Sequence, residues 1–105
     1  MSEIDPSWLD EFSAVCQRAV NVWGETEQLR QLQEECGELV AAVSHYSRGR
    51  IDELGLADEI ADVLIMCQQA LLIVGARNVG KALHAKLNRL RGRVEAAEKQ
   101  LELHA

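Results

Sequence analysis

The chain has 105 residues, of which 48% are hydrophobic, seven are glycine and one is proline, and its formal net charge is −6. This composition excludes a disordered or low-complexity chain and predicts one folded domain, residues 1–105. The acidic N-terminus predicts no signal peptide, and the most apolar stretch, residues 60–74, is interrupted by polar side chains and too short to span a bilayer.

The first half of the chain predicts two helices. The first begins near Asp5-Pro6, an acidic N-cap followed by proline, and ends at Gly24. The second begins with a cap at Thr26, runs to about residue 47 and ends at Gly49. Apolar residues recur at helical spacing along both segments, and no segment of the chain alternates with period two.

The second half predicts two more helices. The third covers about residues 56–74, is apolar nearly all round and ends at Gly75, so we expect it to be the most buried. The fourth begins near residues 78–80 and carries a narrow apolar seam with alternating spacings of four and three. The seam residues are Leu83, Leu87, Leu90, Val94, Ala97 and Leu101. The expected fold class is all-α with four helices, bundle-like and oligomeric, because this much apolar surface marks an interface between chains.

Charge is distributed unevenly along the chain. Residues 1–47 carry nine acidic and two basic residues, whereas residues 48–105 carry eight acidic and nine basic residues. The segment 77–93 has six basic residues and no acidic one, so it could contact phosphate groups or simply form a solvated helix face.

Three cysteines, Cys16, Cys36 and Cys67, show no close-paired spacing, and each falls in a helical apolar pattern. We therefore expect buried free thiols in a reducing, cytoplasmic environment, with no membrane partner.

Two acidic pairs with the same spacing lie on the second and third predicted helices. Glu35 and Glu38 border the apolar stripe of the second helix, and Glu59 and Asp62 have a similar offset on the third. If these helices pack through their apolar faces, four carboxylates meet at a half-buried edge, which is costly unless a cation binds there. Oxygen ligands favour Mg²⁺, with Mn²⁺ as a substitute.

The alternative is that these acids are solvated side chains of amphipathic helices. Glu34 lies on the outer side of the second helix, where it could hold a water or a second ion or be solvated. No histidine stands in the acidic pattern, since His45 and His84 fall outside it. This absence argues against a zinc site and against a di-iron bundle.

The doubled acidic motif resembles that of the MazG-type nucleotide pyrophosphohydrolases, the all-α NTP pyrophosphatase superfamily. The family pattern E-x-x-E, spacer, E-x-x-D is matched by Glu35-x-x-Glu38 and Glu59-x-x-Asp62, with Glu34 as the preceding glutamate. The segment "EIADVLIM" is similar to the continuation usual in the family, and the resemblance covers about residues 23–91.

The resemblance implies an activity and a set of site residues. The expected reaction is Mg²⁺-dependent hydrolysis of nucleoside triphosphates (NTP or dNTP) to nucleoside monophosphate and pyrophosphate, as nucleotide-pool house-cleaning. The implied metal ligands are Glu35, Glu38, Glu59 and Asp62, and the implied catalytic residues are Glu34, Glu35 and Glu38. A water oriented by the metal, or by Glu34 or Glu38, would attack phosphorus.

The resemblance also points to residues that contact the substrate. The segment "KALHAKLNRLRGR" is similar to a family Lys…Asn-x-x-Arg element, which maps onto Lys86, Asn88 and Arg91, with Lys81 as a further candidate. Trp23, beside a helix end, is a candidate for stacking on the base. Family members are commonly dimers or tetramers, so a homodimer or homotetramer is expected, with no nucleic-acid polymer as partner.

Two alternatives remain open from the sequence. One is a related phosphoribosyl-ATP pyrophosphohydrolase activity, since the motif does not select a base or a sugar. The other is a non-enzymatic helical oligomerisation or regulatory module, which accounts for the seam on the fourth helix but not for the acidic pairs.

Overall fold

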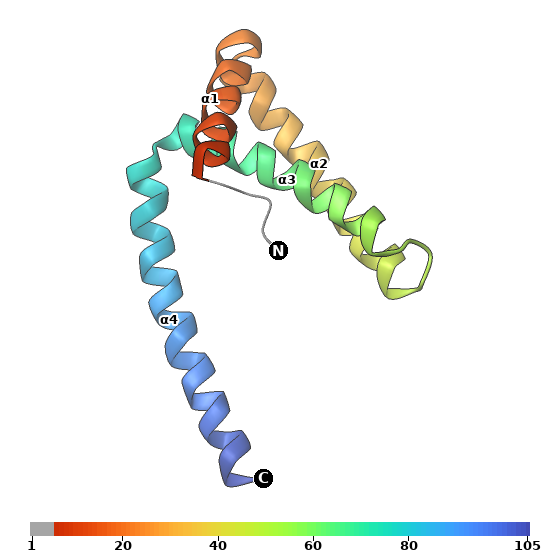
Figure 1. Cartoon of the computed structure of the whole chain (residues 1–105), viewed down its shortest axis with the longest axis vertical. Coiled ribbons are helices and arrows are strands. Elements are labelled where there is room, and N and C mark those ends of the chain that lie inside the picture. The colour runs from red at the N-terminus through yellow and green to blue at the C-terminus, as the bar shows by residue number, and fades with distance from the viewer. Residues whose placement is uncertain (1–5) are drawn as a thin grey trace. The chain divides into compact units, whose positions relative to one another are not determined.

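A computed structural model describes residues 6–105, which form four α-helices and no strand (Figure 1). The helices are α1 (Pro6–Trp23), α2 (Glu25–Ser47), α3 (Glu53–Val74) and α4 (Ala76–Leu103). The all-α prediction and the predicted number of helices are confirmed for this part of the chain. Two compact units are distinguished, residues 1–73 and residues 74–105, and each is described by itself.

Glycines with positive φ angles mark the helix boundaries. Gly24 (φ 89°) and Gly75 (φ 104°) directly precede α2 and α4, and Gly49 (φ 73°) follows α2. A side chain with a Cβ is disfavoured in this left-handed region, so glycine lets the backbone turn between consecutive helices at low cost. The three predicted glycine boundaries are thus confirmed.

The second and third helices start earlier than predicted. Gly24, not Thr26, occupies the N-cap position of α2, and no side chain caps that end. Helix α3 begins about three residues before its predicted start, because Asp52 caps it. The Asp52 Oδ1 atom accepts a hydrogen bond from the backbone N–H of Gly55 at 2.9 Å, which satisfies a donor of the first turn.

The fourth helix also starts earlier than predicted, directly after Gly75 rather than near residues 78–80. Asn78 lies inside its first turn, where the side-chain Nδ2 donates a hydrogen bond to the carbonyl oxygen of Val74 at 2.7 Å. The predicted cap of the first helix, Asp5, lies outside the described residues.

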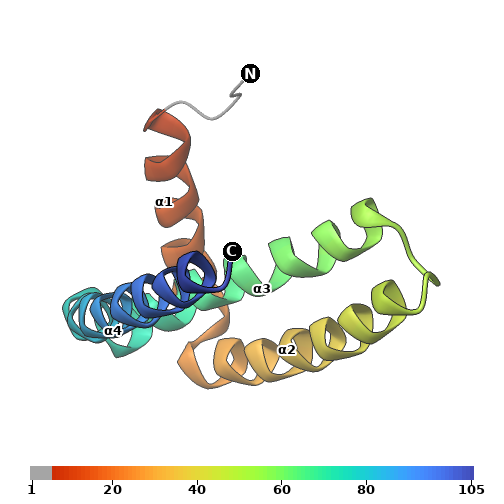
Figure 2. The same ribbon diagram turned by 90° about the horizontal axis from the view of Figure 1, so that it is seen from below.

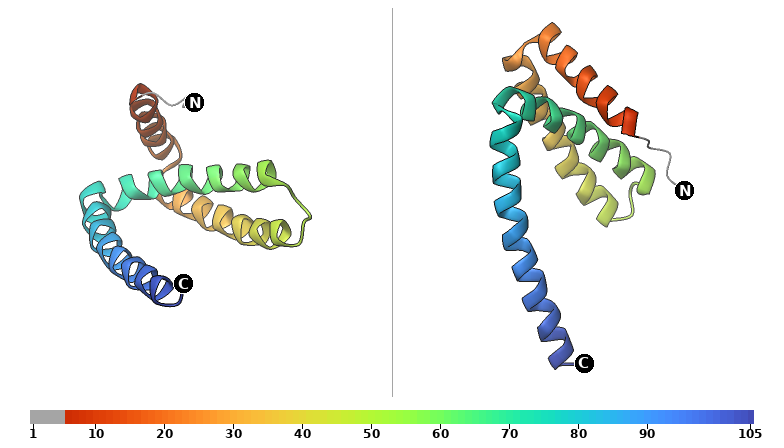
Figure 3. Two further views of the ribbon diagram at one scale, coloured as in Figure 1. Left: turned by 60° about the horizontal axis from the view of Figure 1, so that its bottom comes forward. Right: turned by 60° about the vertical axis from the view of Figure 1, so that its left-hand side comes forward.

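In the first unit, α2 and α3 run in opposite directions beside each other and are joined by the loop 48–52 (Figures 2 and 3). Buried Gln28 and Gln69 hydrogen-bond through their side chains and link these two helices. Helix α1 contacts α3 through the thiol of Cys16, which donates to the carbonyl oxygen of Ile65 at 3.7 Å. These contacts hold α3 between the other two helices of the unit.

The apolar core of the described residues is small. Its buried apolar side chains are Cys16, Val20, Ala42 and Met66, and no large side chain is fully buried. Helix α3 buries only Met66 and Gln69, and Leu64 near its middle is 59% exposed. Among the four described helices, α3 still has the largest share of buried and half-buried residues, so the expectation that it is the most buried is confirmed, although part of its apolar surface stays exposed within one chain.

Helix α4 forms most of the second unit and has no buried residue. Its apolar seam is open to solvent, with exposed fractions between 45% and 71%. These seam residues are Leu83, Leu87, Leu90, Val94 and Leu101. An apolar stripe of this length on a single helix requires a partner surface to become buried.

The prediction of three buried thiols is wrong for two of them. Cys16 is buried, and burial raises its pKa, whereas Cys36 and Cys67 are exposed free cysteines. Both cysteines lie on helix faces that are open to solvent in this chain. No single helix in the described chain is long and apolar enough to cross a membrane; only α3 and α4 taken together, across their break, meet that criterion.

Candidate functional site

Three of the four predicted metal ligands meet at the edge between α2 and α3. Glu35, Glu38 and Glu59 each contribute one carboxylate oxygen, and these oxygens all lie within 4.8 Å of one another. We call these three residues the acid cluster. Glu35 and Glu59 are half-buried and Glu38 is exposed, so the cluster lies partly withdrawn from solvent while one side remains accessible.

The acid cluster lacks an internal positive charge. The negative charge of Glu35, together with a hydrogen bond between the two side chains, raises the pKa of Glu38. Burial and the charges of Glu59 and Asp62 raise it further. The Oε2 atoms of Glu35 and Glu59 are buried and have no hydrogen-bond partner. Such oxygens are costly in the absence of a ligand, because each has lost water without gaining a donor.

The fourth predicted ligand, Asp62, is not part of the acid cluster. It is exposed and lies one turn after Glu59 on α3. Its charge still acts on Glu38, whose pKa it helps to raise. Asp62 therefore belongs to the electrostatic environment of the cluster.

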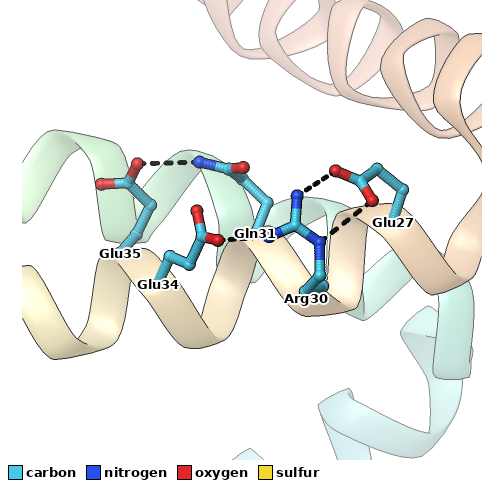
Figure 4. A network of polar contacts seen from close by, with 5 residues as sticks. All are labelled: Glu27, Arg30, Gln31, Glu34 and Glu35. Atoms are coloured by element: carbon cyan, nitrogen blue, oxygen red, sulfur yellow. Dashed lines mark hydrogen bonds and ion pairs between the residues drawn. The ribbon is translucent and has the colours of Figure 1, made fainter.

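Glu34, a predicted catalytic residue, belongs to a separate polar network on α2 (Figure 4). Arg30 forms ion pairs with Glu34 and with Glu27, and its Nε also donates to Glu27 Oε2 at 3.1 Å. We call Glu27, Arg30 and Glu34 the Arg30 network. The hydrogen bond from Arg30 lowers the pKa of Glu27.

Gln31 lies on the same helix as the Arg30 network and contacts Glu35 of the acid cluster (Figure 4). Its Nε2 donates a hydrogen bond to Glu35 Oε1 at 3.1 Å, so this oxygen is satisfied while Oε2 of the same carboxylate is not. Glu35 is thereby positioned by an uncharged donor that leaves its negative charge in place.

An open pocket of about 390 Å³ adjoins the acid cluster. Glu38 and Glu59 belong to both the cluster and the pocket wall. Two further polar residues, His45 and Asp58, line the pocket and are absent from the predicted site. His45 could have been found from its spacing, since seven residues after Glu38 place it about 20° from that side chain around the helix. Asp58 directly precedes the predicted ligand Glu59, but consecutive residues lie about 100° apart around a helix, so the spacing does not place Asp58 on the same face as Glu59.

The predicted phosphate-contacting residues all lie on α4, in the second unit, and all are exposed. Arg91 Nη1 donates a hydrogen bond to Asn88 Oδ1 at 3.0 Å, and Lys81 and Lys86 lie on the same helix. Trp23, the predicted stacking residue, is the last residue of α1 and is 64% exposed; it does not line the pocket.

Comparison of the chain with protein-family models, with curated proteins and with solved structures gives no match. The resemblance to MazG-type enzymes therefore rests on the motif residues themselves.

Proposed function

We propose that this chain is a Mg²⁺-dependent nucleoside triphosphate pyrophosphohydrolase of the MazG type, which hydrolyses NTPs or dNTPs to nucleoside monophosphate and pyrophosphate. The observation that carries the proposal is the acid cluster, where three carboxylates from two helices meet without a compensating cation. Two of their oxygens are buried without a partner, as expected of a site that completes its contacts by binding a ligand.

The donor set fits a hard divalent cation. Glu35, Glu38 and Glu59 offer only oxygen atoms, and Asp62 lies near enough for its charge to act on Glu38. Oxygen-only sites with several carboxylates suit Mg²⁺, and Mn²⁺ can replace it. A bound cation would neutralise the carboxylates and offset the negative charge that develops on the phosphates during hydrolysis.

The chain's own residues have distinct roles in this proposal. Glu38 is the best placed to accept a proton from the attacking water, because it is the exposed member of the acid cluster. Glu35 is half-buried beside it and would hold the cation. Glu34 can orient water only after its ion pair with Arg30 is broken.

The basic residues of α4 supply positive charge for an acidic protein that must attract a polyanion. Lys81, Lys86, Asn88 and Arg91 would contact the phosphates, and Trp23 would stack on the base. The attack is at the α–β phosphoanhydride, so pyrophosphate leaves as one piece.

The experiment is a product analysis with a panel of canonical and modified NTPs and dNTPs, together with phosphoribosyl-ATP, in the presence and absence of Mg²⁺. We expect nucleoside monophosphate and pyrophosphate only when Mg²⁺ is present. Release of orthophosphate with nucleoside diphosphate would place the cleaved bond elsewhere and reject the proposed chemistry. Turnover confined to phosphoribosyl-ATP would favour the phosphoribosyl-ATP pyrophosphohydrolase activity.

We also propose a bundle-like homodimer or homotetramer in the cytoplasm, acting in nucleotide-pool house-cleaning. The small core and the exposed seam of α4 support assembly, because a second copy would bury apolar surface on both chains at once. Light scattering during size-exclusion chromatography should give a multiple of 11.7 kDa. A monomer that stays active on dilution would contradict this.

A non-enzymatic helical module is the second candidate, and the exposed seam of α4 is the observation that favours it. It would assemble as expected but would show no triphosphate turnover. The panel and the mass measurement together separate it from the enzyme.

A further inference from the structure

The pocket beside the acid cluster is formed where small residues face each other on α2 and α3. Ala41, Ala42 and Gly55 line it, and its volume of about 390 Å³ lies within the range of small-molecule sites. An added Cβ at Gly55 would lie 3.3 Å from Ile51 Cβ, so a larger residue there would crowd the wall. These residues keep open a space whose polar end is the acid cluster.

The polar groups in the pocket wall are mainly hydrogen-bond acceptors. Glu38, Asp58 and Glu59 are carboxylates, which accept when ionised and cannot donate. Glu38 and Glu59 also belong to the acid cluster, which leaves Asp58 as the carboxylate available to a second group. Asp58 is exposed to solvent, and its side chain is not paired with any described residue.

An acceptor of this kind distinguishes the nucleobases. Cytosine, adenine and guanine carry exocyclic amino groups that donate hydrogen bonds, whereas thymine and uracil carry a carbonyl oxygen where cytosine has its amino group. A carboxylate attracts the amino group and repels the carbonyl oxygen.

We propose that this pocket receives the base of the nucleotide and that Asp58 selects bases with an exocyclic amino group over uracil and thymine. The inference rests on the proposed function, because the triphosphate must lie at the acid cluster for its base to enter the adjoining pocket. Asp58 acts as a specificity-determining residue, and the acid cluster supplies the chemistry.

The first test compares CTP, UTP and methyl triphosphate, which has no base, in wild type and in Asp58→Asn. Wild type should prefer CTP over UTP in kcat/KM by roughly tenfold or more. Asp58→Asn should bring that ratio to about one, because the amide can also donate to a carbonyl oxygen. Hydrolysis of methyl triphosphate should not change.

The matched control is Asp10→Asn, an exposed carboxylate on α1 outside the pocket, which should leave all three rates unchanged. A CTP-to-UTP ratio that Asp58→Asn does not alter would overturn the proposal. An equal loss for methyl triphosphate would do the same, since the residue would then act on the chemistry or on folding.

A second variant, Ala41→Leu, fills the pocket from its exposed side. It should raise KM for CTP severalfold without changing KM for methyl triphosphate. Ala14→Leu, at an exposed alanine of α1, is the control. Unchanged KM for CTP in Ala41→Leu would remove the base from this pocket.

The last test needs no catalysis. Titration of wild type with cytidine and with uridine, followed by amide chemical shifts, should perturb Ala41, Ala42 and Gly55 more strongly with cytidine, and Asp58→Asn should abolish the difference. If cytidine binds there while no triphosphate is hydrolysed, the proposed function fails and the pocket assignment stands. If triphosphates are hydrolysed and neither nucleoside perturbs these amides, the pocket assignment fails alone.

Discussion

Helix α2 carries two groups of carboxylates one after the other, and the two groups differ in whether a basic side chain is paired with them. In the Arg30 network, Glu27 and Glu34 flank an arginine that pairs with both (Figure 4). In the acid cluster, Glu35 and Glu38 meet Glu59 and have no cation of the chain within their group. The pKa of Glu27 is lowered by Arg30, and the pKa of Glu38 is raised by Glu35.

The difference shows that acidic residues at helical spacing do not by themselves indicate a binding site. The Arg30 network stabilises one helix through contacts three and four residues apart. The acid cluster contains residues of two helices, and the repulsion between its carboxylates destabilises the fold as long as no ligand binds there. A group of like charges that remains uncompensated, with a matched compensated group beside it, is the stronger candidate for function.

The largest expected effect is loss of activity when the acid cluster is broken. Glu38→Gln keeps the side-chain size but removes a ligand charge and the proton acceptor. We expect kcat/KM to fall about 100-fold or more, which corresponds to a loss of about 2.7 kcal/mol or more of transition-state stabilisation. Glu27→Gln, on the same helix but in the Arg30 network, should stay within about twofold of wild type. Similar losses in both variants would show that the two groups do not differ in function.

A second effect is the stabilisation of the fold by Mg²⁺. At a Mg²⁺ concentration 100 times Kd, binding adds about 2.7 kcal/mol, or roughly 10–20 °C in Tm for a chain of this size. Glu59→Gln should lose most of this shift, and Asp62→Asn should keep about half of it, because Asp62 lies outside the acid cluster.

Thermal melts of wild type, Glu59→Gln and Asp62→Asn with and without Mg²⁺ measure how much of the Tm shift each protein keeps. If Asp62→Asn loses as much of the shift as Glu59→Gln, the bound state includes Asp62 as a direct ligand. A full shift in Glu59→Gln would remove Glu59 from the metal site.

The sequence predicts the helices well and the site in part, for identifiable reasons. Apolar periodicity and the glycines place the helices, because both are local signals. The early start of α3 depends on the cap at Asp52, which precedes the apolar pattern and so gives no periodic signal. Spacing fixes the angle of each acid around its own helix, but the axial offset between α2 and α3 decides which acids meet. That offset brings Glu59 to the acid cluster and leaves Asp62 outside it.

The pocket and the cysteines show the same limit. His45 shares the face of Glu38, yet only the meeting of α2 and α3 makes that face the wall of a pocket. Cys36 and Cys67 lie in apolar patterns, which indicate a preference for burial but do not show whether side chains of the same chain pack against them. The exposed apolar faces of α3 and α4 agree with the sequence, where the apolar surface of these two helices is more than one short chain can bury; which residues stay exposed depends on the fold.

A smaller effect concerns stability without metal, where the two groups should respond with opposite signs. The pKa of Glu38 is raised in the folded state, so its ionisation costs stability as pH rises through that raised pKa. Glu38→Gln removes this cost and should raise Tm at pH 7 by about 1–4 °C. Glu34→Gln removes one ion pair of Arg30 and should lower Tm by about 1–2 °C. Melts in a chelator measure both, and a shift of the same sign in the two variants would contradict the comparison.

The smallest effect is the pH dependence of the Arg30 network. Arg30 lowers the folded-state pKa of Glu27, so the contact contributes stability above the unfolded pKa of about 4.3 and loses it as pH falls through the lower folded pKa. Both side chains are exposed, so Arg30→Gln should lower Tm by only about 1–2 °C at pH 7 in low salt. The difference should vanish near pH 2 and in about 1 M salt, where protonation and screening remove the attraction. Arg18→Gln, an exposed arginine of α1, is the control and should show no such dependence. A difference between wild type and Arg30→Gln that persists at low pH and in high salt would show that Arg30 stabilises α2 through packing of its aliphatic stem, and the contrast between the two carboxylate groups would then not be electrostatic.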